Sequence, residues 1–121
     1  MDRTPLVLVV EDDLDILEAI CDALEANGYH VARARNGAEA LERVVEARPS
    51  VILLDLMMPV MDGAAFAGQL RTAGRGDIPI VVISADGNPR QAALIGAQGY
   101  LAKPFDLQAL LTQVASMTSH V

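Results

Sequence analysis

Three short stretches of the chain are apolar without interruption, and they limit the possible folds more than any other feature. They cover residues 6–10, 51–54 and 80–83. A strand with one face in water alternates apolar and polar residues, so an unbroken apolar run predicts a strand that is buried on both faces. Strands of this kind occur in parallel sheets that helices cover on both sides.

Two weaker strands are predicted over residues 29–34 and 99–102, and a helix pattern follows every strand. The apolar residues at helical spacing in the first helix are Leu14, Leu17, Cys21 and Leu24, before a terminal Gly28. Asn36 and Glu39 form the expected capping pair of the second helix. The apolar residues of that helix are Ala38, Leu41 and Val45.

The remaining three helices are read in the same way. The third carries Phe66 and Leu70 on one face. The fourth begins at Asn88 and must stop by Gly96, so it has only about two turns. Asp106 caps the fifth helix. The apolar residues of the fifth helix are Leu107, Leu110, Leu111, Val114 and Met117.

Strands and helices thus alternate five times, which predicts an α/β fold with a doubly wound, five-stranded parallel sheet and five helices on both faces. The length of 121 residues fits a single domain over residues 1–121. Aromatic residues make up only 3% of the chain, so we expect a core of Val, Leu, Ile and Ala.

Charge and cysteine content exclude several classes of function. The formal net charge of -7 argues against a nucleic-acid-binding surface, because phosphate backbones attract Lys and Arg. The single cysteine, Cys21, excludes an internal disulfide and a cysteine-based metal cluster. The apolar run at the N-terminus is too short for a signal peptide or a membrane span. We therefore expect a cytoplasmic protein that binds neither nucleic acid nor membrane.

Polar side chains directly follow four of the predicted strands. They are Glu11 and Asp12 after the first, Asp55 after the third, Ser84 after the fourth and Lys103 after the fifth. Each alone has an ordinary interpretation, as a helix-start acid, a loop serine or a solvated lysine. In a parallel sheet, however, all strands end at the same edge, where α/β proteins bind ligands. We therefore expect these five side chains to lie together.

Such a cluster suits phosphoryl transfer to a carboxylate. Carboxylates that are forced together repel one another unless a cation lies among them, and oxygen ligands without His or Cys favour Mg²⁺. Asp55 is the predicted nucleophile, which would become an aspartyl phosphate. Lys103, the Ser84 hydroxyl and the backbone N–H groups that follow Asp55 and Ser84, at Met57 and Ala85, would hold the phosphoryl oxygens.

Four segments of the sequence resemble the receiver domain of two-component response regulators. They are VVEDD (9–13), LLDLMMPVMDG (53–63), IPIVVISA (78–85) and GYLAKPF (99–105), and their order and spacing match as well. The resemblance covers essentially the whole chain. It implies a flavodoxin-like fold of the chemotaxis-receiver type with strand order 2-1-3-4-5.

The resemblance also implies a role for each matching position. Asp55 corresponds to the phosphoacceptor and Lys103 to the lysine that pairs with the phosphate. Asp12 and Asp55 would bind Mg²⁺ directly, the backbone carbonyl of Met57 would be the third protein ligand, and Glu11 would act through a water. Asp13 lies one position after the acidic pair of the family and is interpreted as a residue at the start of the first helix. The switch residues would be Ser84 and Tyr100. The family usually has a cis peptide bond at the position of Lys103-Pro104.

Partners and signalling follow from the same resemblance. A sensor histidine kinase or a histidine phosphotransfer protein would supply the phosphoryl group, docking near Leu14, Leu17 and Phe105. The domain would catalyse its own phosphorylation and dephosphorylation without being a conventional enzyme. It would regulate a downstream protein or an output domain through its fourth helix, fifth strand and fifth helix.

The fourth helix departs from the family pattern. Between Ser84 and Gly96 the chain is about one helical turn short of the usual spacing. Because relatives use this face to dimerise, we expect a monomer or a weak dimer. The sequence ends directly after the fifth helix, which predicts no output domain in this chain.

Three alternative functions would each call for different sequence features. A degenerate receiver that acts only as an interaction module would not need the complete set of site residues. A metal-dependent phosphohydrolase would need an acid two residues after the nucleophile, where this chain has Met57. A nucleotide-binding flavodoxin-like protein would need a Gly- or Ser/Thr-rich loop after the first strand, where Glu11 and Asp12 would repel a phosphate.

Overall fold

A computed structural model of the chain describes residues 4–56, 63–85 and 89–118. The strands are β1 (Leu6–Val10), β2 (His30–Ala34), β3 (Val51–Asp55), β4 (Ile80–Ser84) and β5 (Gly99–Ala102). The helices are α1 (Leu14–Ala26), α2 (Gly37–Glu46), α3 (Gly63–Thr72), α4 (Pro89–Leu94) and α5 (Leu107–Thr118). All strand pairs are parallel and the order is β2-β1-β3-β4-β5, which confirms the predicted sheet.

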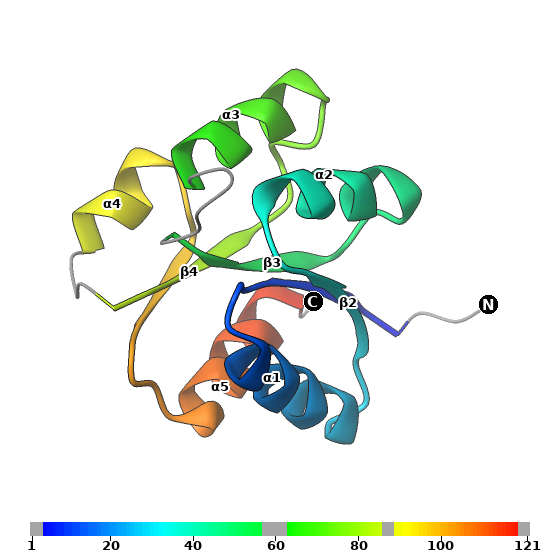
Figure 1. Ribbon diagram of the computed structural model, residues 1–121, viewed down its shortest axis with the longest axis vertical. Coiled ribbons are helices and arrows are strands. Elements are labelled where there is room, and N and C mark those ends of the chain that lie inside the picture. Colours follow the sequence, from blue (N-terminus) through cyan, green and yellow to red (C-terminus); the bar gives the residue numbers. More distant parts are fainter. Residues whose placement is uncertain (1–3, 57–62, 86–88, 119–121) are drawn as a thin grey trace.

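The helices divide between the two faces of the sheet, as Figure 1 shows. Helices α1 and α5 cover one face, and α2, α3 and α4 cover the other. Two separate apolar cores result, one with Leu17, Ile20, Leu110 and Val114, the other with Ala40, Val44, Phe66 and Leu70. The described helices are all too short or too polar to cross a membrane.

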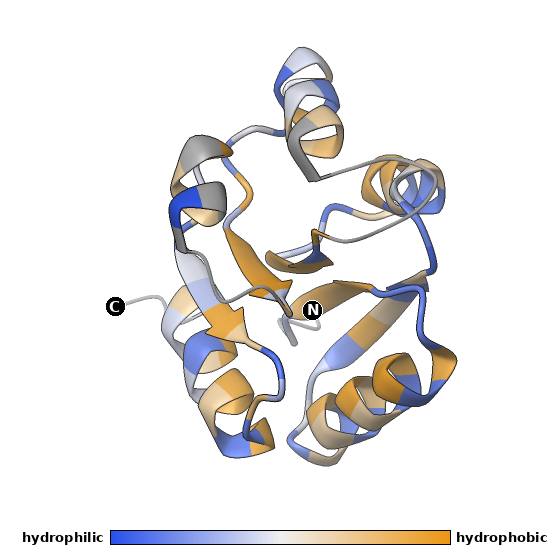
Figure 2. Ribbon diagram, turned by 60° about the vertical axis from the view of Figure 1, so that its left-hand side comes forward, coloured by the Kyte–Doolittle hydropathy of each residue, from blue (hydrophilic) through white to orange (hydrophobic). Residues whose placement is uncertain are grey.

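The unbroken apolar runs are explained by these two cores. In β1, Val7 and Val9 pack toward α1 and α5, while Leu8 and Val10 pack toward the opposite face. Successive side chains of a strand point to opposite faces, so every residue of a covered strand enters one core or the other. Figure 2 shows this as a band of hydrophobic colour along the sheet, between helices of mixed colour.

Helix ends follow the predicted capping residues. Asp13 caps α1 and accepts hydrogen bonds from the backbone N–H groups of Asp15 and Ile16 at 3.0 and 3.2 Å. Asn36 caps α2 and accepts one from Glu39 N–H at 2.9 Å. The reciprocal bond of Glu39 goes to the N–H of Arg35, one residue before the cap. Each cap satisfies donors that the first helical turn leaves without a partner.

Four details of the sequence prediction were wrong. Leu14, placed in the apolar stripe of α1, is 50% exposed. The buried residues of α2 are Gly37, Ala40 and Val44. Of the predicted apolar stripe, Leu41 packs against the core, whereas Ala38 is exposed and Val45 is 70% exposed. Small residues at 37 and 40 let α2 pack on the sheet. Strand β2 begins at His30, one residue after its predicted start at Tyr29. Leu107, placed on the inner face of α5, is 40% exposed.

Candidate functional site

The predicted site residues meet at the carboxyl edge of the sheet. Glu11 follows β1, Asp55 ends β3, Ser84 ends β4 and Lys103 follows β5. Strands β1, β3, β4 and β5 are consecutive neighbours, so these positions form one row along the edge. Glu11, Asp55 and Ser84 are each at most 3% exposed, whereas Asp12 is exposed. The row therefore combines buried polar groups with one carboxylate that is open to solvent.

Lys103 connects the two buried carboxylates. Its ammonium Nζ lies 2.9 Å from Glu11 Oε1 and donates a hydrogen bond to Asp55 Oδ2 at 3.3 Å. The Lys103 backbone N–H donates to the Ser84 carbonyl at 2.8 Å, which anchors the start of this segment at the end of β4. Lys103 is the single lysine of the chain, and its side chain is 19% exposed.

Burial of these charges changes their acidity. Burial raises the pKa of Glu11 to about 7, and its contact with Asp55 adds to the increase. The Lys103 ammonium and the Asp13 N–H, which donates to Glu11 Oε2 at 3.2 Å, act in the opposite direction. Burial by itself would lower the pKa of Lys103, but Glu11 and Asp55 together raise it. The site therefore holds more negative charge than one lysine balances.

The acidic side chains are close enough to bind a metal ion. Glu11, Asp12 and Asp55 each offer a carboxylate oxygen within 4.8 Å of the other two. Glu11 Oε1 is buried and contacts the Lys103 ammonium at 2.9 Å, and the same ammonium is shared with Asp55. Buried carboxylates that share one cation repel each other, and a second cation would reduce that repulsion. The donor set thus fits a divalent cation that prefers oxygen ligands.

The two predicted switch residues lie on the same face of the sheet. Tyr100 is paired with Val82 in the register of β4 and β5, and Ser84 follows Val82 by two residues. Side chains two positions apart on a strand share a face, so Ser84 and Tyr100 both face the α4 side. Ser84 is fully buried. The Tyr100 hydroxyl is also buried and has no hydrogen-bond partner within the described ranges.

Other predicted features are only partly within the described residues. The Lys103-Pro104 peptide bond is cis, as the family resemblance implies. Ala85, the predicted source of a backbone N–H, follows β4 and is exposed. Met57, with its predicted N–H and carbonyl contacts, lies outside the described residues, as does Asn88 at the start of the fourth helix.

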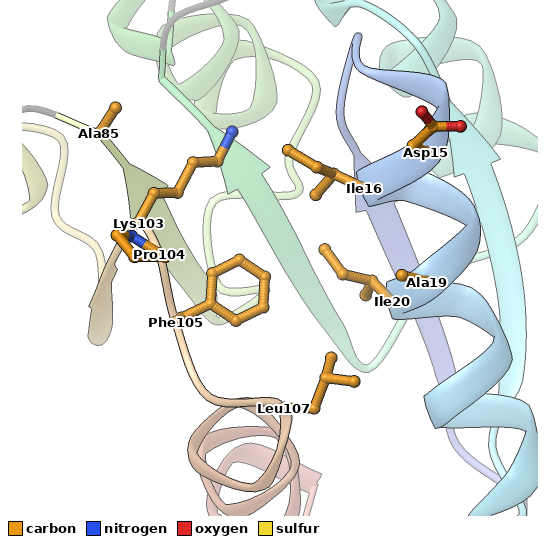
Figure 3. A pocket seen from close by; sticks show the side chains of 9 residues that line it. All are labelled: Asp15, Ile16, Ala19, Ile20, Ala85, Lys103, Pro104, Phe105 and Leu107. Carbon is orange, nitrogen blue, oxygen red and sulfur yellow. The ribbon is translucent and has the colours of Figure 1, made fainter.

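An apolar groove adjoins the site, and sequence reasoning located it only approximately. It has a volume of about 580 Å³ and lies between α1 and the segment that joins β5 to α5, as Figure 3 shows. The residues that line it are Asp15, Ile16, Ala19, Ile20, Ala85, Lys103, Pro104, Phe105 and Leu107. Of the predicted docking residues, Phe105 lines the groove and Leu14 is 50% exposed nearby in the chain.

The third docking residue was wrong, because Leu17 is 2% exposed and belongs to the core. Ile16, the residue before it, is partly buried against the same core, and Glu18, the residue after it, is exposed. Ile16 and Ala19 were missed, whereas Ile20 lines the groove but is 0% exposed and belongs to the core, as Leu17 does. The available signal was the spacing of three residues between Ile16 and Ala19 beside the core stripe, which marks a second apolar face on the same helix.

The strand order and the acidic cluster at the carboxyl ends define the class of CheY-like α/β domains. Comparisons with known proteins specify the family. The sequence profile of the response regulator receiver domain matches residues 7–115. The chain belongs to the response regulator receiver family, whose members are the phosphorylation-dependent switches of two-component systems.

Two curated relatives illustrate the match. The transcriptional regulatory protein PrrA of Mycobacterium tuberculosis is 44% identical over 117 residues, which cover 94% of this chain and 50% of PrrA. The response regulator MprA of Mycobacterium leprae is 42% identical over 114 residues, 92% of this chain and 50% of MprA. The chain thus spans about half the length of these relatives.

Solved structures give the same result for the fold. The receiver domain of the Francisella response regulator 1452 is 31% identical, with a TM-score of 0.87 over 95% of this chain and 97% of that one. The chemotaxis response regulator CheY4 of Vibrio cholerae is 32% identical, with a TM-score of 0.87 over 94% of this chain and 98% of CheY4.

Proposed function

We propose that Asp55 accepts a phosphoryl group from a phosphorylated histidine of a sensor histidine kinase or a histidine phosphotransfer protein. The observation that carries this proposal is the pairing of a buried Asp55 with Lys103, beside the carboxylates of Glu11 and Asp12. In the transfer, an Asp55 oxygen attacks phosphorus, a new O–P bond forms, and the P–N bond breaks with its electron pair leaving on the imidazole nitrogen. The partner histidine takes up a proton.

Lys103 stabilises the charge that builds up on the phosphoryl oxygens. Its ammonium already lies 3.3 Å from Asp55 Oδ2, so it needs little reorganisation to contact a group attached there. The Ser84 hydroxyl and the N–H groups at Met57 and Ala85 are proposed to hold the other oxygens. The same arrangement, with water as the attacking group, would release phosphate again, so the domain would catalyse both reactions on itself.

Mg²⁺ is the proposed cofactor. Asp12 and Asp55 would bind it directly, Glu11 through a water, and the Met57 carbonyl would complete the protein ligands. The described donor set of three carboxylates, of which two share a single lysine, supports a hard divalent cation. When bound, Mg²⁺ neutralises charge on the transferring oxygens.

Phosphorylation is proposed to act as a two-state switch. An aspartyl phosphate adds negative charge at the end of β3, and the Ser84 hydroxyl moves toward it. Tyr100, on the same face, then changes position and alters the surface of α4, β5 and α5. The buried Tyr100 hydroxyl without a described partner supports a side chain with a second available arrangement.

The groove between α1 and the β5–α5 segment is the proposed docking site of the phosphodonor. Ile16 and Ile20 face Phe105 across it, and Lys103 forms its upper end, as Figure 3 shows. A helix that carries the phosphorylated histidine would therefore lie directly beside Asp55, because Lys103 contacts both the groove and Asp55. This encounter would take place in the cytoplasm.

The output step involves the face formed by α4, β5 and α5. Its target is proposed to be a downstream protein or an output domain. The matched part of PrrA and MprA is 50% of each protein, so the other half of each could hold such a domain. Helix α4 has six residues, which supports the expectation of an altered face and a monomer or weak dimer. Sedimentation of the phosphorylated protein tests this, and a stable phosphate-dependent dimer through α4 would contradict it.

The central experiment treats the unmodified wild-type protein with a small phosphodonor. Acetyl phosphate with MgCl₂ should add one phosphoryl group, detected by intact mass, and chelation of the metal with EDTA should prevent the addition. Asp55→Asn should abolish it, whereas Asp77→Asn, an exposed acid away from the site, should not. A protein that gains no phosphoryl group under these conditions would instead be a phosphorylation-independent interaction module.

A further inference from the structure

Strand β5 lies between the Tyr100 ring and helix α5. Tyr100 packs against the core that contains Ala92 of α4, whereas the next residue, Leu101, belongs to the core under α1 and α5. Successive side chains of a strand point to opposite faces, and Figure 1 shows α4 and α5 on opposite sides of the sheet. A rearrangement of the Tyr100 ring therefore acts directly on the α4 side, whereas its route to α5 leads through the strand.

One side chain of α5 is bonded to that strand. Gln113 Nε2 donates a hydrogen bond to the backbone carbonyl of Tyr100 at 3.3 Å. The hydroxyls of Thr112 and Thr118 donate to carbonyls of α5 itself, so among the described residues of α5 only Gln113 uses its side chain to hydrogen-bond to another element. Neither β5 nor α5 contains a charged residue, so no ion pair can join the two. The Gln113 amide is thus the polar link between α5 and the strand of Tyr100.

The adjacent glycine leaves room for this amide. A Cβ placed on Gly99 would lie 2.5 Å from Gln113 Oε1 and 3.1 Å from a methyl group of Val81. The first distance is too short for two atoms that are not bonded, so the Gln113 amide occupies space that a side chain at position 99 would need. One end of the amide packs on Gly99 and the other end bonds to Tyr100, so two successive residues of β5 hold it.

We propose that Gln113 transmits the phosphorylation-dependent change at Tyr100 across the sheet to α5. This inference rests on the proposed switch and assigns a residue to one of its steps. A hydrogen bond depends on distance and direction, so a shift of the Tyr100 backbone draws the amide and its helix with it. The apolar contacts of Leu110 and Val114 also hold α5 on the sheet, but they have no such directional requirement. Gln113 is therefore a positioning residue that acts through Tyr100.

NMR shifts of α5 amides in the presence of acetyl phosphate and MgCl₂ test the proposal. In the wild type, phosphorylation should shift the amides of Ala115 and Ser116. Gln113→Met keeps a side chain of similar length but cannot donate, so it should lose most of these shifts. The gain of one phosphoryl group by intact mass and the shift of the Tyr100 ring should remain. Gln108→Met makes the same change at an exposed position of α5 and should keep the wild-type shifts.

Gly99→Ala disrupts the same contact from the strand. Its methyl group displaces the amide of Gln113, so the α5 shifts should be lost although Gln113 is still present. The double variant should lose no more than Gln113→Met alone, because both changes act on one contact. A purely structural role would lower the free energy of unfolding of Gln113→Met in urea and leave the α5 shifts intact. That result, or loss of the Tyr100 shift together with those of α5, would overturn the proposal.

Tyr100→Phe separates failure of this inference from failure of the proposed function. The change removes the buried Tyr100 hydroxyl on the α4 side without any phosphoryl group. It should shift the amides of Ala115 and Ser116 when Gln113 is present and not in the Gln113→Met background. A protein that shows this dependence but gains no phosphoryl group refutes the phosphoacceptor assignment and supports the link to α5. A protein that is phosphorylated, but in which neither response depends on Gln113, refutes only the link.

Discussion

The ammonium of Lys103 lies 3.3 Å from the carboxylate of Asp55, although the two residues are 48 positions apart in the chain. The contact joins the end of β5 to the end of β3 across β4. Glu11, on the other side, contacts the same ammonium at 2.9 Å. One cation thus holds two buried carboxylates.

Replacing Lys103 by Met should destabilise the protein. The variant leaves Glu11 and Asp55 buried without their cation, and removing one member of a buried ion pair costs about 3 kcal/mol. We expect a lower free energy of unfolding at pH 8 in urea titrations. Added MgCl₂ should raise the melting temperature of this variant more than that of the wild type, because Mg²⁺ then replaces the missing charge.

Lys103→Arg is the control for this variant, because it keeps the charge and should lose less stability. A Lys103→Met protein as stable as the wild type would contradict this account.

The raised pKa of Glu11 predicts that stability depends on pH. In the unfolded chain this carboxyl ionises near its ordinary value of 4.5, whereas in the folded protein it stays protonated up to about pH 7. Between these values the folded state binds more protons, so the free energy of unfolding should fall as pH rises from 4.5 to 7. The loss contributed by Glu11 is at most about 3 kcal/mol.

Glu11→Gln should remove most of that decrease, because the amide does not titrate. Urea unfolding at several pH values in the presence of EDTA measures it for both proteins. A wild-type curve that rises across the same window, with no difference from Glu11→Gln, would show that the side chain is ionised throughout.

The adjacent acids Asp12 and Asp13 should have different roles. Asp13 caps α1, so Asp13→Ala should lower the free energy of unfolding by about 1 kcal/mol and leave Mg²⁺ affinity nearly unchanged. Asp12 makes no cap and belongs to the acidic cluster. Asp12→Ala should therefore weaken Mg²⁺ binding by about tenfold or more without loss of stability. Calorimetric titration with MgCl₂ and urea unfolding separate the two effects, and matching profiles for both variants would refute the assignment.

Two neighbouring valines test the orientation of α2. Val44 is 1% exposed and packs against the sheet, whereas Val45 is 70% exposed. Val44→Ala should cost about 2 kcal/mol from lost apolar burial and the resulting cavity. Val45→Ala should change stability by less than about 0.5 kcal/mol, since it removes almost no buried surface. The reverse order would support the stripe that the sequence alone suggested.

The sheet was predictable from local sequence. The runs at β1, β3 and β4 have a distinctive pattern because both faces are covered, and the strand ends identified which polar residues would meet. Capping residues were predictable too, because each one bonds only to the first turn of its own helix, as Asp13, Asn36 and Asp106 do. The orientation of α2 was not predictable, because Ala38, Ala40, Val44 and Val45 offer two apolar faces of similar hydrophobicity. Only contact with the sheet distinguishes them.

The sequence by itself determined the order of strands and helices, the two-sided burial of the central strands, and the set of polar residues at their carboxyl ends. These depend on side-chain periodicity and on the shared direction of parallel strands. Only the tertiary structure decided that Lys103 is shared between Glu11 and Asp55, and that Ile16 and Ile20 face Phe105 across a groove. Those features depend on how α1 and the end of β5 approach each other, and no local pattern encodes the distance between segments so far apart in the chain.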